Sequence, residues 1–347
     1  MITIMIVDDS PTDTAILRHI FESEPNLSVI ACARNGREAV DLVPKLKPNV
    51  IAMDIQMPVM DGYEATDTIM RQWPTPIVMI SSAISDSESE ATFRSLESGA
   101  LTVLPKPRSI GSNQYIQESR YLVDTIKSMA EIKVIKKRSI AVVNANQPRV
   151  QPDKYAKTHY NIIAIGASVG GPQALRAVLS DLPADFPLPI VIVQHMTHGF
   201  MDGFTKWLDS HIYMRVKCAE AGELLLPGVI YFAPDGVHTV VDNCHNELYV
   251  KLIPDNKESY FCPSISVLMK SIASACGKHA IGVLLTGMGS DGAEGMLELK
   301  NKGAHTIIQD EKSSVVFGMA GVAKSLGAVD KTIDLVQIAK YLSEITK

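Results

Sequence analysis

The chain has 347 residues, enough for two domains of ordinary size, and its 46% hydrophobic and 20% charged residues are typical of a soluble globular protein. No apolar run approaches the roughly 18 residues that a membrane-spanning helix needs. The N-terminus lacks a basic segment and has two aspartates among its first ten residues, so we expect no signal peptide and a cytoplasmic protein. The five cysteines form no Cys-x-x-Cys pair, which favours reduced thiols over a zinc or redox site.

The net charge of −5 argues against nucleic acid as the main partner, but the charge is unevenly distributed. Residues 1–130 carry 11 basic and 17 acidic side chains, residues 131–157 carry 7 and 2, and residues 158–347 carry 15 and 19. The middle segment has little apolar periodicity and reads as a basic, flexible linker. We therefore expect two domains, 1–130 and 158–347, joined by the linker 131–157.

Five short apolar runs alternate with helical spacing in the first domain, which predicts a (βα)5 unit with a parallel sheet. The runs are Ile2–Val7, Val29–Ala33, Val50–Met53, Ile77–Ile80 and Leu101–Leu104. Helix signals lie between them, and Gly99 is expected to close the fourth helix.

Polar side chains follow several of these runs. Asp8 and Asp9 come after the first and Asp54 after the third, so the three carboxylates are expected at one edge of the sheet. Crowded carboxylates repel one another unless a cation joins them, and an all-oxygen set suits Mg²⁺. Ser81 adds a hydroxyl after the fourth run and Lys106 a positive charge after the fifth. Together these groups could form and hold an acyl phosphate.

The same residues resemble the receiver domain of two-component response regulators. The segments that carry the resemblance are Val7-Asp8-Asp9-Ser10, Asn35-Gly36-Arg37-Glu38-Ala39, Asp54-Ile55-Gln56-Met57-Pro58-Val59-Met60-Asp61-Gly62 and Pro105-Lys106-Pro107. The resemblance implies that Asp54 is the phosphoacceptor, that Asp8, Asp9 and Asp54 bind Mg²⁺, and that Ser81 and Lys106 contact the phosphoryl group. It also implies a sensor histidine kinase as phosphodonor. Val103 departs from the pattern, because receivers commonly carry an aromatic switch residue there.

The second domain begins with an apolar run, Ile162 to Ala167, that breaks into glycines and presents Ser168 before a helix. This pattern predicts a buried parallel strand and a strand-to-helix turn, with Ser168 at the sheet edge where α/β proteins place their chemistry. Ser168 could be a nucleophile. A phosphate-binding turn or a plain connection is the alternative, although the glycine pattern is incomplete for dinucleotide binding.

Two further strands deliver polar side chains to their carboxyl ends. Ile190–Val193 leads to His195, and Ile281–Leu285 leads through glycines to Asp291. Serine, histidine and aspartate at three strand ends are the groups that activate a hydroxyl. Asp291 could instead be only the N-cap of a helix over 293–302. The competitors for the base are His198, His211, His238, His245, His279 and His305.

We predict a doubly wound, mainly parallel α/β sheet for this domain, with an added antiparallel hairpin. Val229–Phe232, His238–Val241 and Leu248–Ile253, with turn residues between them, predict a meander joined to that sheet, and 264–277 predicts an amphipathic helix.

The domain also resembles the catalytic domain of chemotaxis receptor glutamate methylesterases. The matching segments are Ile165-Gly166-Ala167-Ser168-x-Gly170-Gly171-Pro172, Gln194-His195-Met196, Tyr231-x-Ala233-Pro234, Leu284-Leu285-Thr286-Gly287-Met288-Gly289-x-Asp291-Gly292-Ala293 and Gln309-Asp310-x-x-Ser313-x-Val315. The resemblance implies a protein-glutamate methylesterase that also deamidates glutamines of methyl-accepting chemotaxis receptors. It implies Ser168 as nucleophile, His195 as base and acid, Asp291 as the orienting group and the Met288 backbone N–H as oxyanion donor, with no cofactor for hydrolysis.

Four positions depart from this second pattern: Val169, Thr197, Cys262 and Ser266. None is expected to contact the serine, histidine or aspartate. We expect the receiver to cover the active site at rest and phosphorylation of Asp54 to shift a closed–open equilibrium.

Three alternatives stay open at this point. The chain could be a non-enzymatic regulator whose output domain binds a partner. It could be a DNA-binding regulator, although its acidic second domain shows no basic recognition helix, or a nucleotide-binding domain, although it lacks a full glycine fingerprint and a Walker lysine.

Overall fold

The computed structural model describes residues 1–81, 99–107, 113–130, 159–196, 198–255 and 261–347. The chain divides into two compact units, Met1–Ile140 and Ala141–Lys347. The predicted linker and the fourth helix expected before Gly99 lie outside the described residues, as does Thr197. Each unit is described by itself below.

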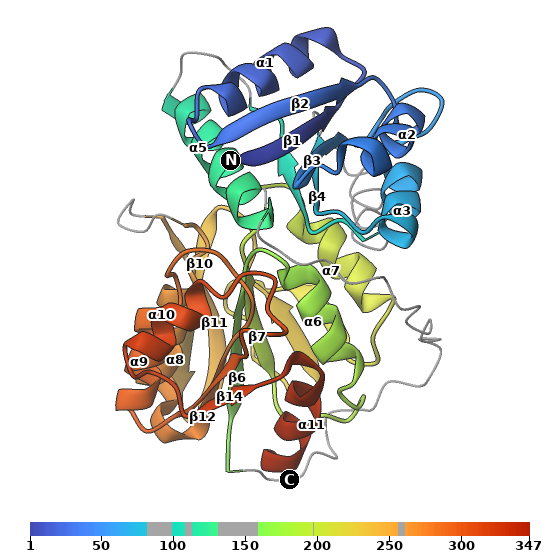
Figure 1. The fold of residues 1–347 in the computed structure, drawn as a ribbon. Coiled ribbons are helices and arrows are strands. Elements are labelled where there is room, and N and C mark those ends of the chain that lie inside the picture. Colours follow the sequence, from blue (N-terminus) through green and yellow to red (C-terminus); the bar gives the residue numbers. More distant parts are fainter. Residues whose placement is uncertain (82–98, 108–112, 131–158, 197, 256–260) are drawn as a thin grey trace. The chain divides into compact units, whose positions relative to one another are not determined.

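The N-terminal unit is built on a five-stranded parallel sheet in the order β2-β1-β3-β4-β5. Its strands are β1 (Ile2–Val7), β2 (Leu27–Ala33), β3 (Val50–Asp54), β4 (Ile77–Ser81) and β5 (Thr102–Pro105). One face is covered by α1 (Pro11–Glu22) and α5 (Asn113–Ala130), the other by α2 (Gly36–Leu46) and α3 (Gly62–Gln72) (Figure 1). This is the predicted receiver architecture.

Local sequence explains where the helices of this unit begin. Ser10, Asn35 and Asp61 each accept, through a side-chain oxygen, the backbone N–H three residues further on, which satisfies a donor that the helix itself leaves unpaired. Asp8 follows the end of β1 and Asp54 ends β3, and in both cases a helix begins within eight residues.

The C-terminal unit has a seven-stranded sheet in the order β14-β13-β12-β6-β7-β9-β8, and every paired strand runs parallel to its neighbour. The strands are β6 (Ile162–Ala167), β7 (Ile190–Gln194), β8 (Arg215–Cys218), β9 (Val229–Phe232), β12 (Ala280–Leu284), β13 (His305–Gln309) and β14 (Lys331–Ile333). The chain adds β7 on one side of β6 and β12 on the other, so β6 lies at a topological switch point, where α/β sheets open a crevice.

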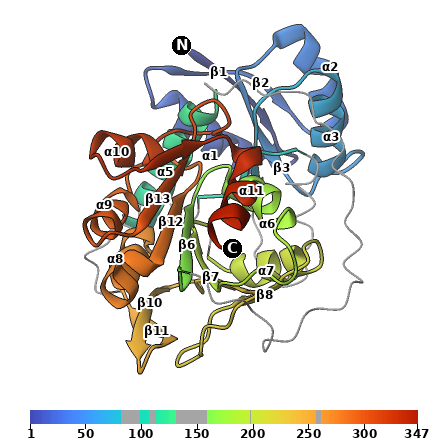
Figure 2. The ribbon, with the colours of Figure 1, turned by 90° about the horizontal axis from the view of Figure 1, so that it is seen from below.

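Helices cover both faces of this sheet, which is why its central strands are buried and, apart from Gln194 at the end of β7, apolar. Figure 2 shows α6 (Gly171–Ser180), α7 (Met201–Asp209) and α11 (Leu335–Ile345) on one face, and α8 (Ile265–Cys276), α9 (Ala293–Asn301) and α10 (Met319–Ser325) on the other. The predicted doubly wound sheet is confirmed. A short 3-10 turn, Gly277–His279, follows α8.

The predicted meander is wrong in one of its three strands. Only β10 (Val237–Cys244) and β11 (Glu247–Pro254) form an antiparallel hairpin, in a sheet of their own. β9 instead pairs parallel with β7 and β8, because its Val-Ile-Tyr-Phe run is apolar on both sides and fits a sheet covered on both faces. The hairpin contacts α8, where the Val241 N–H donates to Ser271 Oγ at 3.0 Å.

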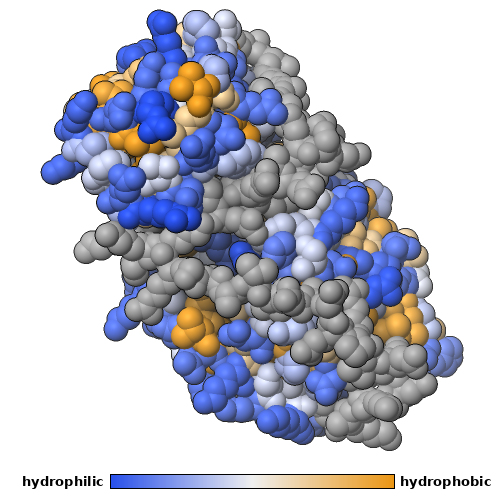
Figure 3. All heavy atoms as spheres, turned by 90° about the vertical axis from the view of Figure 1, so that its right-hand side faces the viewer, coloured by the Kyte–Doolittle hydropathy of each residue, from blue (hydrophilic) through white to orange (hydrophobic). Residues whose placement is uncertain are grey.

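Among the described residues, no helix is both long and apolar enough to cross a bilayer. On the face drawn in Figure 3, the coloured hydrophobic residues form separate small patches among hydrophilic ones. Scattered exposed apolar side chains of this kind are normal on protein surfaces.

Candidate functional site

Two buried strand ends place Ser168 and His195 side by side. Ala167, the last residue of β6, pairs with Gln194, the last residue of β7, and the His195 N–H donates to the Ala167 carbonyl oxygen at 2.9 Å. Adjacent strands lie about 4.8 Å apart. The predicted serine and histidine therefore start from neighbouring backbone positions at one edge of the sheet.

A glycine turn carries the chain from Ser168 into α6. Gly170 has a φ of +75°, and a Cβ built there would lie 2.6 Å from the Val315 side chain. The Gly171 N–H closes the turn by donating to the Ser168 carbonyl oxygen at 2.8 Å. Both the left-handed backbone and the lack of space require glycine at residue 170. The predicted strand-to-helix turn is confirmed.

The Gln194 side chain ties this turn to the histidine. Its Nε2 donates to the Ser168 carbonyl oxygen at 2.9 Å and to the His195 carbonyl oxygen at 2.7 Å. Gln194 is 2% exposed, so the amide bridges two backbone segments inside the protein. The sequence places Gln194 in one of the matching segments but indicates no role for it, because only the folded chain shows what a buried amide reaches.

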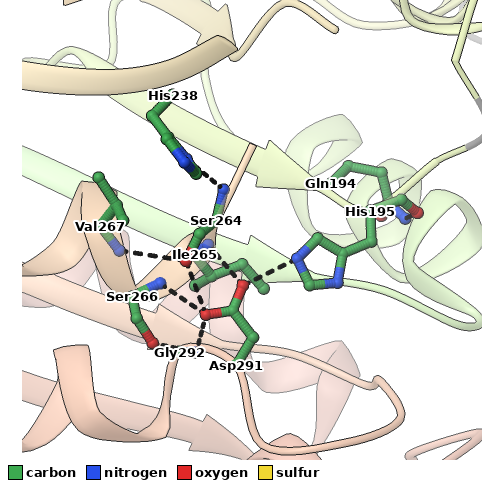
Figure 4. Close-up of polar contacts among 9 residues, drawn as sticks. All are labelled: Gln194, His195, His238, Ser264, Ile265, Ser266, Val267, Asp291 and Gly292. Carbon is green, nitrogen blue, oxygen red and sulfur yellow. Dashed lines mark hydrogen bonds and ion pairs between the residues drawn. The ribbon is translucent and has the colours of Figure 1, made fainter. Parts of the chain in front are cut away.

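His195 and Asp291 form a buried pair. His195 Nε2 lies 2.9 Å from Asp291 Oδ2, although the strands that precede them, β7 and β12, are separated by β6 (Figure 4). His195 Nδ1 is buried and has no hydrogen-bond partner among the described contacts. The ring of Phe261 stacks on the imidazole, with centroids 4.1 Å apart and planes 15° from parallel. The imidazole is thus fixed by a carboxylate at one nitrogen and by an aromatic ring on one face.

The Asp291 carboxylate also caps a helix, but not the one that follows it. Gly292 is the N-cap of α9, whereas Asp291 accepts N–H bonds from Ile265 at 2.7 Å and Ser266 at 3.0 Å, at the start of α8. Ser264 Oγ donates to it at 2.9 Å. The alternative that Asp291 merely starts its own helix is therefore wrong.

These donors decide the charge of Asp291. Burial by itself would raise the pKa of this carboxyl, but the hydrogen bonds from His195 and Ser266 hold it well below its usual range. The partial positive charge of the α8 N-terminus acts in the same direction. Asp291 therefore stays a carboxylate beside the imidazole.

The contacts of Ser266 correct one expectation from the sequence. Its N–H donates to Asp291, and its Oγ accepts the Gly292 N–H at 2.7 Å, so this position does contact the predicted site. The sequence indicates no role for Ser264, which also donates to Asp291. Its position just before an apolar helical stretch was the available signal, because serine is a preferred N-cap residue.

The loop after β12 lies against Ser168. The Ser168 N–H donates to the Thr286 carbonyl oxygen at 3.1 Å, and a Cβ built on Gly287 would lie 2.8 Å from Ser168 Cβ. Thr286 Oγ1 in turn donates to the Val169 carbonyl oxygen at 2.9 Å. Gly287 therefore lies beside the serine, and Met288 follows it in the chain.

The other histidines do not contact the Asp291 carboxylate in the described part of the chain. In the described contacts His211 binds the Trp207 carbonyl oxygen, His279 the His159 carbonyl oxygen, and His305 the Tyr341 hydroxyl. None of the six competing histidines contacts Asp291 in the part of the chain that is described.

The N-terminal unit brings its predicted residues together as well. Carboxylate oxygens of Asp8, Asp9 and Asp54 lie within 4.8 Å of one another. The Lys106 N–H donates to the Ser81 carbonyl oxygen at 2.8 Å, so β4 and β5 end beside each other. All five predicted residues therefore gather at one sheet edge.

Lys106 is the centre of an ion-pair cluster. Its Nζ lies 2.8 Å from Asp8 Oδ2, 3.0 Å from Asp54 Oδ2 and 2.9 Å from Asp13 Oδ2. Burial alone would lower the pKa of Lys106, but hydrogen bonds to Asp8 and Asp13 and the charge of Asp54 raise it. The sequence pattern did not indicate Asp13, although it lies in the first turn of the helix that starts at this edge.

Burial has the opposite consequence for the acids. It raises the pKa of both Asp8 and Asp54, and the Lys106 ammonium offsets only part of that effect. Because burial disfavours the ionised form of these acids, a second cation beside Lys106 would stabilise the carboxylates.

Comparisons with known proteins agree with both units. The model of the CheB methylesterase family matches residues 163–342, and that of the response regulator receiver domain matches residues 4–117. The chain is 41% identical to protein-glutamate methylesterase/protein-glutamine glutaminase 2 of Methanospirillum hungatei, over 100% of this chain and 99% of the relative. It is 43% identical to protein-glutamate methylesterase/protein-glutamine glutaminase 1 of Syntrophus aciditrophicus, over 99% and 98%.

A solved structure is also similar. The CheB methylesterase catalytic domain of Thermotoga maritima matches with a TM-score of 0.53 and 34% identity, covering 54% of this chain and 99% of that one. Full-length similarity to named methylesterases, together with both domain matches, leaves one assignment: this chain belongs to the CheB methylesterase family and carries a response regulator receiver domain before its catalytic domain.

Proposed function

We propose that this protein hydrolyses methyl esters of glutamate side chains on chemotaxis receptors, deamidates receptor glutamines, and is activated by phosphorylation of Asp54. The observation that carries the proposal is the His195–Asp291 pair at 2.9 Å, next to the strand end that bears Ser168. A hydroxyl, a base and an orienting carboxylate are the groups that acyl transfer needs near neutral pH. The names of the relatives suggest the substrate.

In the proposed first step, Ser168 Oγ attacks the side-chain carbonyl carbon of the methylated glutamate and His195 takes the hydroxyl proton. Because Nε2 faces Asp291, Nδ1 is the nitrogen that would accept this proton. This is the reverse of the common arrangement in serine hydrolases, where Nδ1 faces the aspartate. Asp291 holds the proton on Nε2 and stabilises the imidazolium that forms.

In the steps that follow, the tetrahedral intermediate collapses and the methoxy oxygen leaves as methanol with the proton from His195. A water molecule, deprotonated by His195, then attacks the acyl carbon, the bond from that carbon to Ser168 Oγ breaks, and His195 returns the proton to Oγ. The products are the glutamate side chain, which ionises to a carboxylate, and the free Ser168 hydroxyl. For a glutamine side chain the leaving group is ammonia, and the rest of the cycle is the same.

The backbone N–H of Met288 is the proposed donor to the oxyanion. Its support is the position of the preceding residue, Gly287, where a Cβ would lie 2.8 Å from Ser168 Cβ. A backbone donor held beside the nucleophile needs no reorganisation when negative charge develops on the carbonyl oxygen.

For the receiver, we propose that Asp54 accepts a phosphoryl group from a chemotaxis sensor histidine kinase in the cytoplasm. The carboxylates of Asp8, Asp9 and Asp54 would hold Mg²⁺; their all-oxygen donor set and close spacing fit this ion. When bound, the ion supplies positive charge for an incoming phosphoryl group. Ser81 and Lys106 are the proposed protein contacts of that group.

The domain limits remain part of the proposal: a receiver over 1–130, a basic linker over 131–157 and a catalytic domain over 158–347. No cofactor is proposed for ester hydrolysis, because the three side chains supply the nucleophile and both proton transfers.

The test is methanol release from receptor membranes carrying labelled methyl esters. The intact protein, Ser168→Ala and Asp54→Asn are compared, each with and without Mg²⁺ and a small-molecule phosphodonor. We expect release to vanish in Ser168→Ala. The phosphodonor should stimulate the intact protein in the presence of Mg²⁺ and should not stimulate Asp54→Asn.

Two results would contradict the proposal. If Ser168→Ala released methanol as fast as the intact protein, the serine would not be the nucleophile and a partner-binding output domain would be the better explanation. If the phosphodonor stimulated Asp54→Asn equally, the switch would not act through this carboxylate.

A further inference from the structure

A second buried histidine contacts the predicted catalytic site through the start of α8. His238 lies on β10 of the hairpin and is 2% exposed. Its Nδ1 accepts the backbone N–H of Ser264 at 3.1 Å (Figure 4). His238 therefore holds the residue at which α8 begins.

Ser264 passes this contact on to the catalytic groups. It is the N-cap of α8, and its Oγ accepts the Val267 N–H and donates to Asp291 Oδ1 at 2.9 Å. Asp291 Oδ2 then faces His195 Nε2. Figure 4 shows the resulting chain of contacts, from the hairpin histidine through Ser264 and Asp291 to His195.

The contact with Ser264 also determines the tautomer of His238. Because Nδ1 accepts a hydrogen bond, the neutral ring carries its proton on Nε2. Nε2 is buried without a hydrogen-bond partner in the described contacts and lies 3.6 Å from Asp255 Oδ1. That distance is too long for a hydrogen bond, but a carboxylate so close favours the protonated nitrogen.

A metal site is the competing interpretation of this cluster. Ligand atoms of His238, Asp255 and Cys262 lie within 4.8 Å of one another. A histidine that binds a metal through Nε2 must carry its proton on Nδ1 and usually donates it to a neighbour, whereas Nδ1 here is an acceptor. Burial also raises the pKa of the Cys262 thiol, which opposes the thiolate that a metal would need.

We propose that His238 is a positioning residue for the proposed esterase reaction. By accepting the Ser264 N–H it fixes the start of α8, whose N–H and hydroxyl donors orient the Asp291 carboxylate toward His195. The inference rests on the proposed function. It states that the rate depends on a hydrogen-bond acceptor at the position of Nδ1 and not on the volume of the ring.

The first test uses three variants of the full-length protein in the methanol-release assay. Asn places its side-chain oxygen where Nδ1 stands, Gln carries its polar group further out, and Leu has no acceptor. We expect kcat to fall about tenfold in His238→Leu and His238→Gln, with KM within about twofold of the intact protein, because the aspartate shifts but the substrate surface does not. His238→Asn should restore kcat to within about threefold of the intact protein.

Thr239→Val is the matched control. Thr239 is the next residue on β10, is fully buried, and its hydroxyl has no hydrogen-bond partner in the described contacts, so valine should leave kcat unchanged. If all three His238 variants lost activity equally, or if Thr239→Val lost as much, the effect would be general disturbance of the hairpin and the proposal would be wrong. Methanol release that depends on Ser168 decides the proposed function separately, before the His238 variants are compared.

The second test does not require activity. NMR of ring-¹⁵N-labelled full-length protein should show His238 with a bare Nδ1 and a protonated Nε2, and addition of Zn²⁺ alone should leave these signals unchanged. A protonated Nδ1 would overturn the inference. So would stoichiometric Zn²⁺ binding that is lost in both His238→Leu and Cys262→Ser, which would establish the metal site instead.

Discussion

Replacing Asp291 with asparagine tests the geometry of the predicted catalytic site most directly. The carboxylate accepts bonds at both oxygens: Oδ2 from His195 and Ile265, and Oδ1 from Ser264, Ser266 and Gly292. An amide has one acceptor oxygen, and its NH₂ group repels the donors at the other end. We expect the oxygen to take the place of Oδ1, where it keeps three donors, and the NH₂ group to face His195.

The consequences for stability and rate can be estimated separately. The Ile265 N–H would lose its acceptor, which costs about 1–3 kcal/mol for a buried donor, and the lost negative charge at the α8 N-terminus costs about 0.3–1 kcal/mol more. The rate falls for another reason. An NH₂ group facing Nε2 makes this nitrogen an acceptor and moves the imidazole proton to Nδ1, where the base is needed. We expect kcat to fall about 10³- to 10⁴-fold.

Methanol release and urea unfolding of the same preparations measure the two effects. The stability difference should also depend on pH. Since the folded-state pKa of Asp291 is depressed, its stabilising contribution is fully present above the unfolded pKa of about 3.9 and is lost as pH falls below that value. The difference in unfolding free energy between the intact protein and Asp291→Asn should therefore shrink in acid.

Asp330→Asn provides the control for this variant. Asp330 also accepts a backbone N–H, that of Thr306 at 2.9 Å, and its pKa is also lowered, with the Thr306 hydrogen bonds opposing the effect of burial. It should lose stability and keep kcat. If Asp291→Asn retained kcat within about tenfold of the intact protein, the orienting role of this carboxylate would be refuted.

Two further predictions concern the loop beside the serine and the receiver acids. Gly287→Ala should lower kcat more than tenfold (about 1.4 kcal/mol), because the added Cβ would lie 2.8 Å from Ser168 Cβ. The control is Gly222→Ala, where φ is +78° and the space around the residue is open, so the substitution should lower stability and leave kcat unchanged. Equal losses of activity in the two variants would contradict the packing argument. Since burial raises the folded-state pKa of Asp8 and Asp54, the receiver should lose stability as pH rises through the range between the unfolded and folded pKa values. Urea unfolding followed by receiver NMR signals should show this slope without Mg²⁺, Mg²⁺ should reduce it, and a flat profile in the metal-free protein would count against the buried acids as its cause.

Sequence was sufficient to place the candidate site residues at strand ends. Apolar runs that stop at Ser168, His195 and Asp54 indicate buried parallel strands by their composition alone, and the carboxyl ends of such strands meet at one edge. This rule correctly predicts that the receiver acids lie close together and that Ser168 lies next to His195. The roles assigned to these residues stay predictions until the variants are measured.

Sequence was insufficient where an element's partner is distant or its pattern is ambiguous. Val229–Phe232 resembles a meander strand, since a short apolar run does not say whether its neighbour is parallel or antiparallel. Asp291 stands before a glycine-capped helix, yet its carboxylate serves α8, which starts 26 residues earlier. The sequence likewise gives no sign that Ser266 contacts Asp291, because the two residues are far apart in the chain.

Only the folded chain decides which atoms meet. Four sets of contacts join segments that are distant in the chain, and no local sequence pattern predicts them. They are the hydrogen bond between His195 Nε2 and Asp291, the hydrogen bond from the Ser264 N–H to His238, the ion pairs of Lys106 with three carboxylates, and the hydrogen bond from the Gln194 amide to the Ser168 carbonyl oxygen. Sequence periodicity records which side of an element is buried, because burial depends on single residues. Hydrogen-bond partners depend on how elements pack, and this packing places the Asp291 carboxylate at the start of α8.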